Sequence, residues 1–132
     1  MLFTLTPIVD VPRAQLDPIT TLPEKLSVFA LAVSRPLRHE TIALCFDHQQ
    51  RGVGLFAFDS SRKLIEIIDR IIGATINIDS ATTVALLTSR GGGYRNRDDK
   101  SQFFMAANRC EDAGLGLSEW LLIANGQLCQ LN

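Results

Sequence analysis

Apolar residues along the chain recur with the period of a helix in three segments. The spacing predicts helices over residues 21–34, 60–72 and 98–113. Thr21 and Glu24 open the first of them as a capping box, in which each side chain bonds the other residue's backbone. Residues 1–20 carry three of the five prolines, which predicts an extended segment laid over the domain.

Compact runs of apolar and β-branched residues mark strands between these helices. The strands are predicted over residues 41–47, 52–59, 83–88, 120–124 and 128–129. Asn125 and Gly126 form a hairpin turn signal before the last strand. The strand over 83–88 is nearly all apolar or β-branched, as in strands that are covered on both faces.

The order helix, strand, strand, helix, strand, helix, strand, strand predicts an α/β (α+β mixed) fold, with one mixed β-sheet flanked by helices. No repeat or linker divides the chain, so residues 1–132 are predicted to be a single domain, with an extended segment over 1–20 and a core over 21–132. The apolar edge strand over 52–59 has to be covered by the N-terminal segment or by a second subunit, because bare strand edges aggregate. A homodimer is therefore one expectation.

Composition narrows the classes of partner. Of the residues 46% are hydrophobic and 20% are charged, with a formal net charge of −1, so the composition indicates neither a nucleic acid nor a membrane partner. The chain opens without the basic region of a signal peptide, and no apolar run approaches the ~20 residues that span a bilayer. Cys45, Cys110 and Cys129 are widely spaced and read as buried thiols in a reducing compartment. We expect a cytoplasmic protein without metal or cofactor.

A glycine and arginine loop follows the strand over 83–88, at a place where many α/β folds carry a site. Its candidate ligand-binding residues are Arg90, Gly91, Gly92, Gly93, Arg95 and Arg97. Backbone N–H groups and guanidinium groups of this kind bind small anions or nucleotides. The loop lacks the spacing of a phosphate-binding loop, and the helix after it starts with two aspartates. A solvated loop, an anion site and a protein-contact loop all stay open.

The remaining candidate residues are aromatic or imidazole side chains. His39 and His48 flank the strand over 41–47 at opposite ends, so they cannot share one metal ion, and we expect surface histidines. Trp120 is the single tryptophan. It is predicted to pack in the core or a groove, with a hot spot in a partner interface as the alternative.

Several local matches resemble the RadC-like branch of the JAB/MPN metalloprotease family. Glu40 precedes TIALCFD, VALLTSRGGG stands where the family has a strand and a His-x-His loop, and Asp98 or Asp99 opens the next helix. The segment LSEWLLIANG, residues 117–126, resembles the closing segment of the family. The resemblance covers roughly residues 37–129 and implies a JAB/MPN-like fold with the layering of cytidine deaminases.

The resemblance also implies a former metal pocket formed by Glu40, Thr88, Arg90 and Asp99. The two zinc-binding histidine positions fall on Thr88 and Arg90, and an arginine repels a divalent cation. Glu40 and Asp99 would then be neighbouring carboxylates, which the planar fork of Arg90 could bridge. We therefore expect a non-catalytic domain that binds a protein partner or itself. The alternatives are a small anion or nucleotide-binding domain and a metal-dependent hydrolase with atypical ligands.

Overall fold

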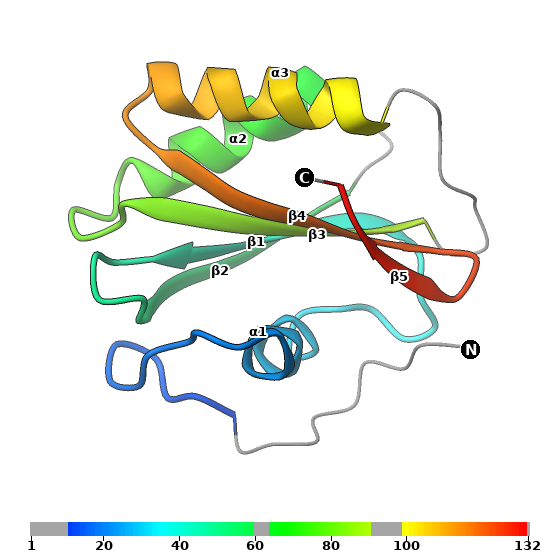
Figure 1. Ribbon diagram of the computed structural model, residues 1–132, viewed down its shortest axis with the longest axis horizontal. Coiled ribbons are helices and arrows are strands. Elements are labelled where there is room, and N and C mark those ends of the chain that lie inside the picture. The colour runs from blue at the N-terminus through cyan, green and yellow to red at the C-terminus, as the bar shows by residue number, and fades with distance from the viewer. Residues whose placement is uncertain (1–10, 60–63, 91–98, 132) are drawn as a thin grey trace.

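A five-stranded mixed sheet with helices on both faces forms the centre of the protein (Figure 1). The computed structural model describes residues 11–59, 64–90 and 99–131. Its elements are α1 (Leu22–Phe29), β1 (His39–Phe46), β2 (Gly52–Asp59), α2 (Leu64–Thr75), β3 (Thr83–Arg90), α3 (Asp99–Asp112), β4 (Gly116–Ala124) and β5 (Gln127–Gln130). This order and the mixed α/β class are the predicted ones.

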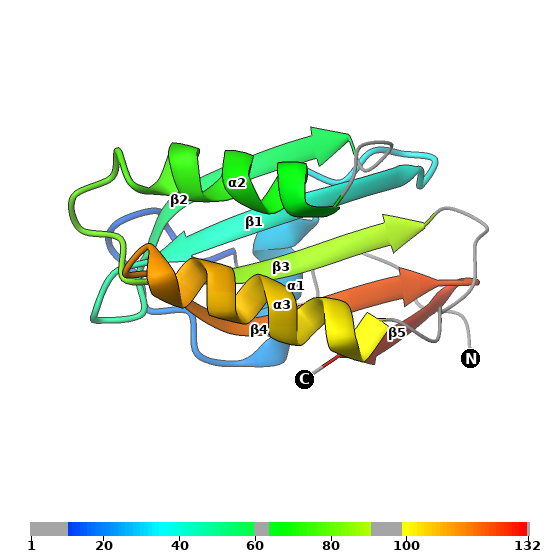
Figure 2. The ribbon, with the colours of Figure 1, turned by 90° about the horizontal axis from the view of Figure 1, so that it is seen from above.

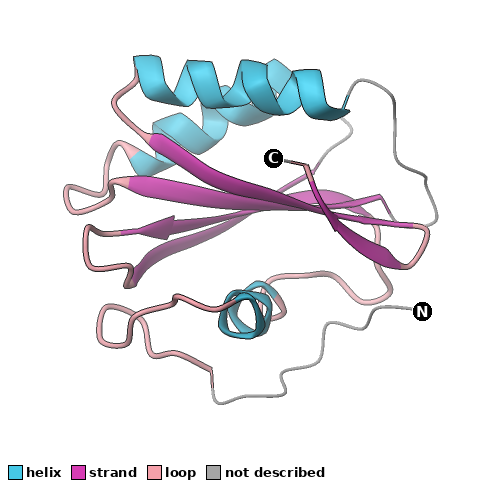
Figure 3. Ribbon diagram, viewed as in Figure 1, coloured by secondary structure: helices cyan, strands magenta, loops and turns pink. Residues whose placement is uncertain are grey.

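The strands lie in the order β2-β1-β3-β4-β5. β3 and β4 are parallel and the other neighbouring pairs are antiparallel. Viewed from above, β2 and β5 form the two edges of the sheet (Figure 2). Helices α2 and α3 cover one face and α1 covers the other (Figure 3). β3 is therefore buried from both sides, as its continuous apolar run predicted.

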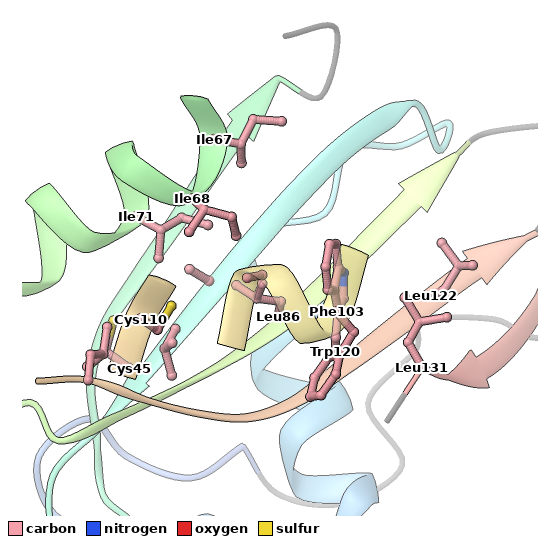
Figure 4. Close-up of a cluster of buried hydrophobic side chains, with 14 of the residues drawn as sticks. Cys45, Ile67, Ile68, Ile71, Leu86, Phe103, Cys110, Trp120, Leu122 and Leu131 are labelled. Atoms are coloured by element: carbon pink, nitrogen blue, oxygen red, sulfur yellow. The ribbon is translucent and has the colours of Figure 1, made fainter. Parts of the chain in front are cut away.

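Alternation along the strands divides the core into two clusters, one on each face of the sheet. On the α2/α3 face lie Ala43, Leu86 and Trp120 with apolar residues of both helices (Figure 4). On the α1 face lie Ile42 and Leu87, with residues of α1 and β4. The face on which a strand residue lies thus follows from its odd or even position.

Helix α1 begins as predicted and ends earlier. Thr21 Oγ1 accepts from the backbone N of Glu24 at 3.3 Å, and Glu24 Oε1 accepts from the backbone N of Thr21 at 3.1 Å, which completes the capping box. The helix was expected to reach Ser34 but ends at Phe29. After it the chain makes tighter turns, in which the backbone N of Leu31 bonds the carbonyl of Val28 at 3.1 Å. These turns bring Ser34 alongside the start of β1.

Other boundaries also differ from the expectation. The helix predicted over 60–72 stops before Gly73, but α2 continues through this glycine to Thr75. The Thr75 side chain is buried, donates to the carbonyl of Ile71 at 2.7 Å and lies 3.3 Å from Cys45 Sγ, so packing holds this last turn. β3 and β4 are longer than predicted because neighbouring strands pair along them. Ser60, the first residue of the helix predicted over 60–72, lies outside the described residues.

The Asn125-Gly126 turn confirms its sequence signal, and a second positive-φ glycine follows α3. Asn125 and Gly126 have φ of 51° and 71°, the pair of positive values that a tight β4–β5 hairpin needs. Gly114 has φ of 80° just after α3, where a left-handed residue ends a helix.

Candidate functional site

The carboxyl end of β3 meets the first turn of α3 through a two-point ion pair. Arg90 Nη1 donates to Asp99 Oδ2 at 3.0 Å, and Nη2 donates to Oδ1 at 2.6 Å. The exposed fraction of the side chain is 14% for Arg90 and 2% for Asp99. Fork-to-carboxylate pairs of this kind are among the stronger and more directional charged contacts. The pair joins the last residue of β3 to the first residue of α3.

A chain of buried hydrogen bonds lies beneath the ion pair on the same face of the sheet. Trp120 Nε1 donates to Thr88 Oγ1 at 2.8 Å, and Thr88 Oγ1 lies 2.9 Å from Thr41 Oγ1. Thr88 and Thr41 face each other across β3 and β1, and Trp120 reaches them from β4. All three residues are less than 5% exposed. The indole and hydroxyl groups therefore satisfy one another in the interior.

Glu40 lies on the opposite, α1 face. Its Oε1 accepts from the backbone N of Ser34 at 2.6 Å and its Oε2 accepts from Ser34 Oγ at 3.0 Å. Arg38 Nε is 3.7 Å from Oε2, but the Arg38 side chain is 74% exposed. Glu40 is 3% exposed and thus anchors the turn after α1 to the start of β1.

The expected former metal pocket of Glu40, Thr88, Arg90 and Asp99 therefore needs correction. In the β1–β3 register Glu40 pairs with Ser89, while His39 pairs with Arg90. Side chains of paired residues point to the same face, so Glu40 and Arg90 point to opposite faces. Arg90 and Asp99 form an ion pair, and Thr88 lies beneath them on the same face. Glu40 lies on the other face, where it binds Ser34.

The described part of the chain holds no group of three or more His, Cys, Asp or Glu side chains that could bind a metal ion. Asp99 is instead bound by the guanidinium group of Arg90, a cation that donates hydrogen bonds and cannot act as a metal ligand. Gly91, Gly92, Gly93, Arg95 and Arg97 lie outside the described residues, so their ligand-binding role stays a prediction. His39 and His48 are exposed at opposite ends of β1, in agreement with surface histidines.

The three cysteines are free thiols, and burial controls their chemistry. Burial raises the pKa of the Cys110 thiol to about 11 and also raises the pKa of Cys45. A raised pKa keeps a thiol protonated, and the protonated thiol is a poor nucleophile. Neither residue is therefore suited to nucleophilic catalysis.

Alkylation with iodoacetamide at pH 8 should modify the folded protein at Cys129, which is half-buried, before Cys45 and Cys110. With a pKa of about 11, roughly one Cys110 thiol in a thousand is ionised at pH 8. Mass spectrometry of tryptic peptides would show the order, and labelling in denaturant should reach all three residues. Equal labelling rates at Cys110 and Cys129 in the folded state would contradict this prediction.

Two contacts on the α1 face were not predicted from the sequence. Ser34 binds Glu40, as described above. Lys25 Nζ of α1 pairs with Glu119 Oε1 of β4, and their side chains are 19% and 11% exposed. Glu119 is an acidic residue next to an apolar run, which signals a buried partner. The identity of that partner depends on how α1 crosses the sheet, which local sequence does not specify.

Comparison of the sequence with protein-family models and with curated proteins gave no match. None of the helices in the described ranges is long and apolar enough to cross a membrane.

Proposed function

We propose that this chain is a non-catalytic domain that works by binding protein, either another chain or its own copy. The Arg90–Asp99 ion pair carries the proposal. It fills the end of β3, the position at which the resemblance to RadC-like JAB/MPN domains would place a zinc ion. A catalytic zinc ion needs three protein ligands and an open position for water. A buried guanidinium supplies none of these.

The polar groups near this pair support the same proposal. Thr88, which stands at the first of the two expected histidine positions, accepts the indole N–H of Trp120. Glu40, the expected third ligand, serves the α1 face. The side chains at the positions where the family has its metal ligands are thus held in hydrogen bonds within the fold. A JAB/MPN-like ancestry remains part of the proposal, as does a cytoplasmic location, with which three free cysteines agree.

Anion or nucleotide binding is the second candidate function, and the described residues favour it less. Arg90 is the described member of the proposed anion site, and its charge is already compensated by Asp99. A phosphate would have to compete with a buried two-point carboxylate for the same guanidinium. Titration with inorganic phosphate therefore serves as a second measurement in the test below.

Titration calorimetry with zinc chloride should detect no stoichiometric binding to the wild-type chain, because Asp99 is already paired with Arg90 at the end of β3. The Asp99→Asn variant is the matched control, and it should give the same trace. One zinc ion bound per chain by the wild type and lost in Asp99→Asn would overturn the proposal and restore the hydrolase. Phosphate bound by the wild type and lost in Arg90→Lys would favour the anion site instead.

A further inference from the structure

We draw no further inference here: the strongest candidate, the hollow of about 210 Å³ that Asp79 lines together with the C-terminal ends of α2 and α3, rests on two helix ends and one exposed carboxylate, and nothing else in the described residues points to a ligand there.

Discussion

Replacing Arg90 by alanine is expected to lower the free energy of unfolding by about 3 kcal/mol. The substitution removes both donors of the two-point pair and leaves the Asp99 carboxylate, 2% exposed, without its guanidinium. Removing one partner of a buried pair costs far more than the pair itself contributes, because the remaining charge stays desolvated. Urea denaturation followed by tryptophan fluorescence measures the change, since Trp120 lies in the core nearby.

Two further variants separate this effect from a general loss of positive charge. Arg38→Ala removes an exposed arginine that is 3.7 Å from Glu40, and it should change stability by about 0.5 kcal/mol or less. The double variant Arg90→Met with Asp99→Leu removes both charges and keeps apolar volume, so it should regain most of the loss. If Arg90→Ala proves as mild as Arg38→Ala, the pair is not the structural element described above.

Replacing Trp120 by alanine is expected to cost about 4 kcal/mol. Trp120 is 4% exposed and packs in the α2/α3 core with Leu86 and Phe103 (Figure 4). Truncation removes the indole and leaves a large cavity in a densely packed layer. It also removes the indole N–H that donates to Thr88 Oγ1. Thermal and urea unfolding both measure the loss.

Conservative variants divide the Trp120 effect into packing and hydrogen bonding. Trp120→Phe keeps most of the ring and loses the donor, so about 1–2 kcal/mol is expected. Phe104→Ala is the control: this α3 ring is 63% exposed, and its loss should cost less than about 1 kcal/mol. An equal cost for Trp120→Ala and Phe104→Ala would show that Trp120 faces a solvated surface, such as a partner hot spot, and not the core.

Local signals predicted the elements and their order well. The capping box of Thr21 and Glu24, the limits of β2 and the Asn125-Gly126 turn all appear where expected. Each depends on residues close together in sequence. The ends of α1 and α2 were predicted less well. Thr75 contacts Cys45 from 30 residues away, and Ser34 binds Glu40, whose orientation depends on the β1–β3 register.

The sequence predicted one part of the candidate site, the ion pair, and not the place of Glu40. Its ion pair was expected from Arg90 and Asp99, at either end of one loop, and their contact follows once β3 and α3 form. The place of Glu40 depends on the register between β1 and β3. A slip of one residue would set Glu40 opposite Arg90, whereas the observed register sets it opposite Ser89 and points it to the other face.

Period, capping and turn chemistry in this chain are therefore enough to define an α/β architecture and to locate the ion pair at the end of β3. Short-range preferences carry that information, since each acts over a few residues. Strand register and the packing of α1 against one face of the sheet decide that Glu40 binds Ser34 and that Lys25 pairs with Glu119. Those assignments arise from burying both sheet faces at once, and no single segment contains the contacts that select them.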